Sequence, residues 1–403
     1  MELSECARSC LKAFWSLIHD EKRNTMSTRI SPQKVLRKLD HIVRMPYYIL
    51  SINRIISKPS YYPDMPRKSR SEMWMDNFKW ILRHQELMTF YTSYGMDVKG
   101  FRNLEDFIPT SVFWNYIRDG NRKGVDIVPG KHYGKYNYLV LLRDKYVFSA
   151  HIAGTLGDQF VPKTIALIDR GNVFIHDSKE YTKLARLCQT DRKAVFKVVD
   201  GSCGNGVFVA NIRDGKIEAE GKVYTPEQMI DRLEGRRYLL QDLVIQHPAL
   251  QVFSTKCVNT IRIITIQGKS GKISVFSAFL RVGTDAESFV DNRAKGGLAI
   301  GIDLESGKLM KYGLPHATYG VMVESHPISG VVFDGYQLPY WKETVDLVCA
   351  AHLQFSQLQS IGWDVAIQER GPVLIEGNDD WEIGGPQDTC GGLKKRWNQL
   401  CNQ

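Results

Sequence analysis

The stretch that most constrains the fold of this chain is Gly362–Glu382, which reads GWDVAIQERGPVLIEGNDDWE. Two short apolar runs flank a Gln-Glu-Arg-Gly turn, and this pattern predicts an antiparallel hairpin. The hairpin would bring Asp364, where the first strand opens, close to Glu376 and Asn378, where the second strand closes. Residues two apart on a strand point to the same face, so Glu376 and Asn378 could share a pair of hard cations. The alternative is a hairpin whose polar ends are merely solvated.

Length and composition exclude several classes of protein. With 403 residues, of which 43% are apolar and 24% charged, the chain has the makeup of a globular protein of two or three domains. No apolar run reaches the roughly 18 residues needed to span a bilayer, and charged residues interrupt the N-terminal stretch, so no secretion signal is expected. The eight cysteines are scattered, without the CxxC pairs of a zinc site or the density of a disulfide scaffold. We expect a cytoplasmic protein.

The positive charge is concentrated near the N-terminus. Residues 1–70 hold 14 Lys and Arg against six Asp and Glu, whereas the whole chain has a net charge of +9. Such a region can attract an anionic membrane face, a phosphorylated substrate or nucleic acid, or it can be a solvated helical face. Nucleic acid is the least favoured partner, because no nucleic-acid-binding motif accompanies the charge. A peripheral position at the inner membrane face is one expectation.

The texture of the sequence changes after about residue 105. Apolar residues at helical spacing predict helices around residues 10–18 and 74–82, and Ser69 with Glu72 predicts a capping box for the second of them. From residue 106 onward, short β-branched and aromatic runs alternate with helical patterns, which indicates an α+β fold. Residues 138–142 fit either a strand or the start of a helix, whereas residues 164–168 read as a buried strand.

A glycine-rich turn, Gly201–Gly206, lies between two apolar strands, with Lys197 in the incoming strand. Such a turn lets backbone N–H groups approach a polyphosphate, and the lysine would add a point charge beside it. No Gly-Lys-Ser/Thr sequence closes the turn and no helix follows it, so it is neither a Walker loop nor a dinucleotide fingerprint. A plain structural turn is the alternative. Cys203 within the turn is read as a small filler in preference to a redox group.

The apolar run at residues 238–245 is interrupted by Gln241 and Asp242. A chain passing beside an adenine there could offer acceptors to the amino group and a backbone donor to the ring. A strand that ends in a polar turn before His247 explains the same residues equally well.

Two arginines stand in strongly apolar strands, Arg262 within residues 259–266 and Arg281 within residues 274–282. A guanidinium in such surroundings is costly without an anionic partner, which could be a phosphate, a substrate carboxylate or a protein carboxylate. The polar segment at residues 290–297 follows, either as a loop that closes over a ligand or as an ordinary surface loop.

Taken in this order, the motifs resemble the ATP-grasp ligases. The segments His326–Gly330, Phe333–Gly335 and Leu338–Trp341 are similar, more narrowly, to the branch described as sugar-transfer-associated ATP-grasp proteins. The resemblance runs from about residue 144 to about residue 386. It implies an ATP-grasp fold, in which two α+β subdomains clamp ATP, preceded by a helical region. The implied domains are a basic helical region at 1–105, an N-terminal and linker part of the ATP-grasp fold at 106–195, and the nucleotide- and metal-binding subdomains at 196–403.

The resemblance also implies roles for individual residues. Lys145, at a helix start after Asp144, is similar to the first ATP lysine of the family, and Lys197 to the second. Asp364, Glu376 and Asn378 match the metal triad. The other implied nucleotide-binding residues, in the phosphate lid and the adenine hinge, are Ser202, Cys203, Gly204, Asn205, Gly206, Gln241, Asp242, Leu243 and Val244. The implied catalytic residues, which hold phosphates and the acyl substrate, are Arg262, Arg281, Asn292 and Lys295.

The chemistry implied by this resemblance is ATP-dependent carboxylate–amine ligation. An amide would form through an acylphosphate, with release of ADP and phosphate, and ATP and two Mg²⁺ ions would be required, with Mn²⁺ as an alternative metal. The implied substrates are a carboxylate and an amine. They would be supplied by an amino acid and a sugar or glycan precursor in surface-polysaccharide or envelope biosynthesis. Two other interpretations remain open: a small-molecule kinase on the same scaffold, and a non-catalytic nucleotide-binding protein that docks to a membrane or a partner.

Overall fold

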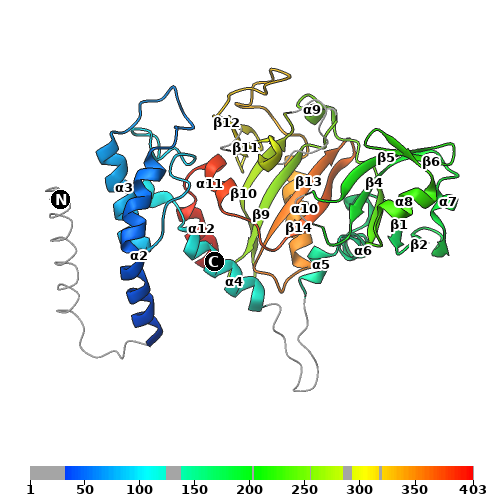
Figure 1. Cartoon of the computed structure of the whole chain (residues 1–403), viewed down its shortest axis with the longest axis horizontal. Coiled ribbons are helices and arrows are strands. Elements are labelled where there is room, and N and C mark those ends of the chain that lie inside the picture. The colour runs from blue at the N-terminus through cyan, green and yellow to red at the C-terminus, as the bar shows by residue number, and fades with distance from the viewer. Residues whose placement is uncertain are drawn as a thin grey trace. The chain divides into compact units, whose positions relative to one another are not determined.

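The computed structural model describes residues 32–123, 138–201, 204–254, 256–284, 293–316 and 320–402. The chain divides into two compact units, one ending at Ile52 and the other beginning at Asn53. Both β-sheets lie in the second unit (Figure 1). The helix predicted around residues 10–18 lies outside the described ranges.

Helices precede the sheets in the sequence, as predicted. Helix α2 spans Pro32–Ile56 and α3 spans Arg70–His84. The capping box that starts α3 is present: the Ser69 hydroxyl accepts from the Glu72 amide at 3.3 Å, and the Glu72 carboxylate accepts from the Ser69 amide at 2.7 Å. These reciprocal bonds satisfy amide groups that a helix start leaves unpaired, which explains why α3 begins where it does. A 3₁₀ turn, η2 (Leu104–Asp106), and helix α4 (Thr110–Lys123) follow.

The first sheet has eight antiparallel strands in the order β3-β2-β1-β8-β4-β5-β6-β7 (Figure 1, green). Its strands are β1 (Thr164–Asp169), β2 (Asn172–Ile175), β3 (Glu180–Thr182), β4 (Arg192–Val198), β5 (Val207–Arg213), β6 (Lys216–Ala219), β7 (Lys222–Tyr224) and β8 (Tyr238–Asp242). Two short helices, α7 (Leu184–Leu187) and α8 (Pro226–Arg232), contribute Leu187 and Met229 to its core. The alternation of buried and exposed residues along β5 is that of a sheet with one covered face.

The second sheet has six antiparallel strands in the order β12-β11-β10-β9-β13-β14. Its strands are β9 (Thr260–Gln267), β10 (Ile273–Val282), β11 (Leu298–Ile302), β12 (Leu309–Pro315), β13 (Ser360–Gln368) and β14 (Gly371–Asn378). The predicted hairpin is therefore β13–β14, and strand pairing places Asp364 opposite Glu376 and Gly362 opposite Asn378. The register shifts between Asp364 and Val365, a β-bulge of the kind that is common beside active sites.

Helices cover both faces of the second sheet. Helices α6 (Lys145–Thr155) and α10 (Trp341–Leu353) pack on the face of Ile261 and Ile263, whereas α4 and α12 (Lys394–Asn402) pack on the face of Ile264 and Ile266. Helix α11 (Gly384–Cys390) contacts β10, β11 and β12. Alternate residues of β9 thus enter different cores, because successive side chains on a strand point to opposite faces.

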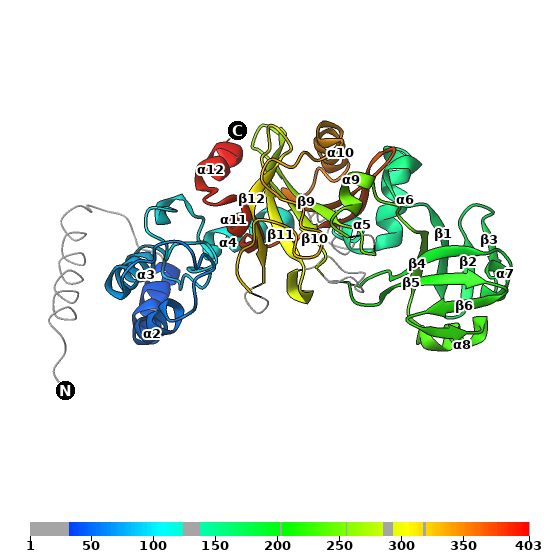
Figure 2. The ribbon, with the colours of Figure 1, turned by 90° about the horizontal axis from the view of Figure 1, so that it is seen from above.

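The short helix α5 (Val140–Arg143) leads directly into α6, so residues 138–142 begin a helix and do not form a strand. Both views show α5 and α6 where the two sheets approach each other (Figure 1, Figure 2). The α+β fold with two antiparallel sheets, preceded by helices, agrees with the sequence prediction. No helix in the described part of the chain is both long and apolar enough to cross a membrane.

Candidate active site

A buried carboxylate with two guanidinium partners lies on the second sheet. Arg262 of β9 is the strand partner of Asp364, with its Nε 2.5 Å from Oδ1 and its Nη2 3.2 Å from Oδ2. Arg281 of β10 places Nη2 2.8 Å from the same Oδ2. Burial opposes ionisation of Asp364, but the two guanidinium groups outweigh it and lower the pKa of the carboxyl to about 2. Of the three anionic partners that remained open for the arginines, the structure provides a protein carboxylate.

The other oxygen-bearing side chains of the hairpin lie at the same end of it. Glu376 faces Asp364 across the two strands, and burial together with the charge of Asp364 raises the pKa of Glu376. Asn378 Nδ2 donates to the carbonyl of Gly362 at 3.2 Å and lies 3.5 Å from Glu376 Oε1. The hairpin therefore brings Asp364, Glu376 and Asn378 together, as its sequence predicted.

Two lysines reach this cluster from outside the second sheet. Lys145 is the first residue of α6, whose amide groups are capped by Asp144 at 2.9 and 3.0 Å. Its Nζ lies 3.7 Å from Glu376 Oε2 and also donates to the carbonyl of Gly201. Lys145 therefore bridges the glycine-rich turn of the first sheet and the hairpin of the second.

The second lysine, Lys197, is partly buried on β4 of the first sheet and donates to Gln241 Oε1 at 3.0 Å. Burial lowers the pKa of Lys197 to about 8; the carboxylate of Glu376 raises it and the charge of Lys145 lowers it further. Above pH 8 this lysine is largely neutral, and an anion arriving beside it would favour its protonated form.

The glycine-rich turn has a backbone that only glycine adopts freely. Gly204 and Gly206 have φ angles of +71° and +70°, and a Cβ on Gly206 would lie 2.4 Å from Val198 Cγ2. A Cβ on Gly204 would lie 3.9 Å from Nζ of Lys295, so the turn approaches a lysine of the segment between β10 and β11. The neighbouring Asn205 is exposed. Of the remaining predicted residues, Ser202, Cys203 and Asn292 lie outside the described ranges.

The predicted hinge separates into two faces. Gln241 is 2% exposed, and its Nε2 donates to Ser149 Oγ and to the carbonyl of Pro162, both at 3.1 Å. Asp242 is the last residue of β8, and its side chain lines a hollow of about 470 Å³ beside Lys163. Because neighbouring strand residues point to opposite faces, the structure joins Gln241 to Lys197 but does not bring the Asp242 side chain to them. Leu243 and Val244 continue as partly buried, irregular chain.

One ion pair of the site escaped the sequence interpretation. Arg143 donates from Nε and Nη2 to the two carboxylate oxygens of Asp379, at 2.8 and 2.7 Å. Asn121 Nδ2 donates to the Asp379 carbonyl at 2.7 Å. These contacts join the residue after Asn378 to the chain just before Lys145. Asp379 directly follows the end of β14 and has the polar neighbours Asn378 and Asp380, so the local sequence gave no signal that its side chain is buried.

The cluster carries more positive than negative charge. Two arginines and two lysines surround Asp364 and Glu376, so the site favours an anion before any metal ion is considered. The oxygens of Glu376 and Asn378 are hard donors, whereas both oxygens of Asp364 contact arginine. This donor set fits a Mg²⁺ ion that is shared with phosphate oxygens, the usual arrangement for Mg²⁺ with nucleotides. Among the residues that the structure describes, no group of three or more His, Cys, Asp or Glu could hold a metal ion alone.

The model of a family described as sugar-transfer associated ATP-grasp matches residues 130–402, about two thirds of the chain. A search of curated proteins finds no match.

Solved structures with a similar chain course include three enzymes. The first is N5-carboxyaminoimidazole ribonucleotide synthetase from Thermotoga maritima (11% identity, TM-score 0.33, 60% of this chain and 43% of that chain). The others are an L-amino acid ligase from Bacillus licheniformis (12%, 0.34, 62% and 43%) and D-alanine–D-alanine ligase from Bacillus anthracis (13%, 0.35, 66% and 68%). The chain spans less than half the length of the first two.

Proposed function

This chain belongs to the sugar-transfer-associated ATP-grasp family, and we propose that it is an ATP-dependent carboxylate–amine ligase. The reaction would release ADP and phosphate and would join an amino acid to a sugar or glycan precursor, in the synthesis of a surface polysaccharide or the cell envelope. The observation that carries the proposal is the positively charged cluster around Asp364 and Glu376, to which both sheets and α6 contribute.

In this proposal Lys145, Lys197 and Arg262 hold the phosphates of ATP in line with the substrate carboxylate. A carboxylate oxygen forms a bond to the γ-phosphorus as the bond to the ADP oxygen breaks. The amine then attacks the acyl carbon, phosphate leaves, and the nitrogen loses a proton. The protein contributes positioning and positive charge, which is where most of the acceleration of phosphoryl transfer arises, and no nucleophile of its own is required.

Glu376 and Asn378, together with Asp364, would hold Mg²⁺. The ion would offset the charge of the phosphate oxygens during transfer. For Asp364 to contribute an oxygen, at least one of its guanidinium contacts must lengthen. A released guanidinium of Arg262 or Arg281 would then face the phosphates, so metal binding and phosphate binding would support each other.

The base of the nucleotide would contact the hinge mainly through the backbone of residues 241–244. The Gln241 side chain already has three hydrogen-bonded partners, and the Asp242 carboxylate lies on the other face of the sheet. Backbone contacts of this kind read the edge of a base without using side-chain charge.

The test uses hydroxylamine as a general amine. The full chain is incubated with MgATP, hydroxylamine and a panel of amino acids and nucleotide-linked uronic acids, and ADP and hydroxamate are measured. An acylphosphate reacts with hydroxylamine to give a hydroxamate, so the proposal predicts equal amounts of hydroxamate and ADP with the correct carboxylate. Glu376→Gln serves as the inactive control.

Two other outcomes would each indicate a different function for this chain. A stable phosphoester with ADP, and no hydroxamate, would make the chain a kinase. MgATP binding without turnover across the whole panel would favour a nucleotide-binding protein that docks to a membrane or a partner.

A further inference from the structure

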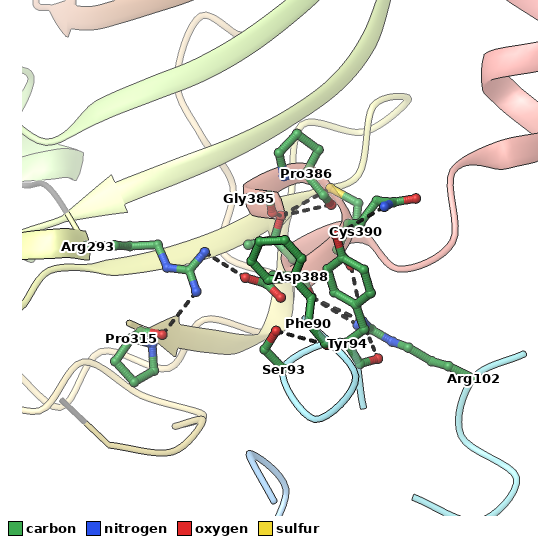
Figure 3. Close-up of polar contacts among 12 residues, drawn as sticks. Phe90, Ser93, Tyr94, Arg102, Arg293, Pro315, Gly385, Pro386, Asp388 and Cys390 are labelled. Atoms are coloured by element: carbon green, nitrogen blue, oxygen red, sulfur yellow. Dashed lines mark hydrogen bonds and ion pairs between the residues drawn. The ribbon is translucent and has the colours of Figure 1, made fainter. Parts of the chain in front are cut away.

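The buried ion pair between Arg293 and Asp388 is not used by the proposed reaction. Arg293 Nη1 lies 2.9 Å from Asp388 Oδ2, and the two side chains are 17% and 5% exposed. Arg293 Nη2 also donates to the carbonyl of Pro315, the last residue of β12, at 3.0 Å. Figure 3 shows Arg293 held between Asp388 on one side and Pro315 on the other.

The helix that carries Asp388 is fixed by residues far away in the sequence. Arg102 donates to the carbonyls of Tyr94, Gln387 and Asp388 at 3.0 to 3.2 Å (Figure 3). Gln387 Nε2 donates to the Tyr94 hydroxyl at 3.1 Å. Three carbonyl oxygens therefore share one guanidinium, and α11 cannot shift without breaking these bonds.

Arg293 and Lys295 are the two ends of one 3₁₀ turn, η4 (Arg293–Lys295). The Gly296 amide donates to the Arg293 carbonyl at 3.1 Å, and Thr284 Oγ1 donates to the Gly296 carbonyl at 2.6 Å. Arg293 is anchored to α11 and β12, whereas Lys295 is exposed and its Nζ lies near Gly204. A turn of three residues is stiff, so fixing one end limits where the other can point.

We propose that Arg293 and Asp388 are positioning residues: their ion pair fixes η4 so that Lys295 faces the phosphate-binding turn at Gly204. This inference rests on the proposed function. Lys295 would contact the terminal phosphate of ATP, and it would do so from a backbone that is already in place, which lowers the entropy lost on binding.

The details of the ion pair favour this role over a purely stabilising one. Asp388 Oδ1 and Arg293 Nε are buried and have no hydrogen-bond partner among the described residues. A buried pair with unsatisfied atoms gains little stability over apolar side chains of similar size. What such a pair does provide is a fixed geometry.

The experiment compares MgATP with MgADP binding by calorimetry, because Lys295 is expected to contact the phosphate that only ATP carries. Arg293→Met and Lys295→Met should each weaken MgATP binding about tenfold and MgADP binding less than twofold. The double variant should bind MgATP no more weakly than Lys295→Met alone, because Arg293 acts through Lys295. Arg293→Lys keeps the charge beside Asp388 and should bind MgATP within about threefold of the wild type.

The matched control is Arg67→Met, which removes the guanidinium partner of Asp97, a carboxylate that is 0% exposed. It should lower the unfolding temperature and leave the ratio of MgATP to MgADP affinity unchanged. The proposal is overturned if the effects of Arg293→Met and Lys295→Met multiply to about a hundredfold, or if Arg293→Met keeps the wild-type ratio. It is also overturned if Arg67→Met changes that ratio equally. A wild-type chain that binds neither nucleotide would instead contradict the proposed function.

Discussion

Replacing Lys197 with methionine should stabilise the folded chain and abolish nucleotide binding. The reason is the environment of the amine, because burial lowers the pKa of Lys197 from 10.5 to about 8. Below pH 8 the ammonium is protonated in both the folded and the unfolded state, yet it is poorly solvated in the folded state. A methionine of similar length fills the same space without carrying a charge.

The magnitude follows from the two pKa values. At about 1.4 kcal/mol per pH unit, holding the ammonium in the fold costs about 3 kcal/mol at pH 7, an upper bound because the side chain is only partly buried. Losing the hydrogen bond to Gln241, and leaving its buried oxygen unpaired, opposes this by about 1–2 kcal/mol. We expect Lys197→Met to raise the free energy of unfolding by about 1–2 kcal/mol at pH 7.

The two pKa values also determine how the difference in stability between the variant and the wild type changes with pH. Between pH 8 and pH 10.5 the unfolded chain binds more protons at Lys197 than the folded chain, so the wild type gains stability relative to the variant as pH rises. At pH 9.5 the free-energy cost of burying Lys197 in the wild type falls to about 1.4 kcal/mol. The difference in unfolding free energy between the variant and the wild type therefore decreases by about 2 kcal/mol. Urea unfolding of both proteins without nucleotide, at pH 7 and pH 9.5, measures the change. An equal difference at the two pH values would refute the reasoning.

Three further predictions concern the same site. Between pH 8 and pH 9, binding of MgATP should raise the pKa of Lys197, so that the complex takes up a proton. The measured binding enthalpy should then vary with the ionisation enthalpy of the buffer. A binding enthalpy that is the same in all buffers would contradict contact between a phosphate and this amine. Glu376→Gln should abolish turnover at little cost in stability, because the surroundings of Glu376 already favour its neutral form. Asp364→Asn should abolish turnover and also lower the free energy of unfolding by about 3 kcal/mol, because it leaves two buried guanidinium groups without their carboxylate. Full activity of either variant would exclude the metal assignment. Gly206→Ala should destabilise the first sheet by more than about 1 kcal/mol and weaken nucleotide binding, because Gly206 has a positive φ and the added Cβ would lie 2.4 Å from Val198. Gly235→Ala is the control for the cost of the positive φ alone, because Gly235 has φ +67° and its Cβ would meet no atom within 4 Å. Equal unfolding free energies for the two variants would argue against a steric effect of Val198.

The hairpin could be predicted because its information is local. The Gln-Glu-Arg-Gly turn and the apolar runs beside it fix the pairing, and the pairing alone places Asp364 opposite Glu376. Lys145 could likewise be placed at a helix start, because Asp144 before it caps the helix.

The partners of the arginines could not be predicted, because they depend on pairing between distant strands. Arg262 and Asp364 meet only since β13 lies beside β9, and the sequence left a phosphate, a substrate carboxylate and a protein carboxylate as equal candidates. The same holds for Arg143 with Asp379 and for the orientation of the Asp242 side chain, which depends on where β8 ends. Local spacing sets which residues share a strand face, while the order of the strands decides which faces meet.

The hydrogen bonds of Gln387 limit where the chain can be truncated without loss of folding. The Ile108 amide donates to Gln387 Oε1 at 2.6 Å, and Gln387 Nε2 donates back to the Ile108 carbonyl at 3.2 Å, across 279 positions of sequence. The family match begins at residue 130, so a fragment trimmed there would lose these bonds and the guanidinium of Arg102. The compact unit begins at Asn53. We therefore expect a fragment of residues 53–403 to stay folded and a fragment of residues 130–403 to aggregate, because the border of the sequence family falls inside one compact unit.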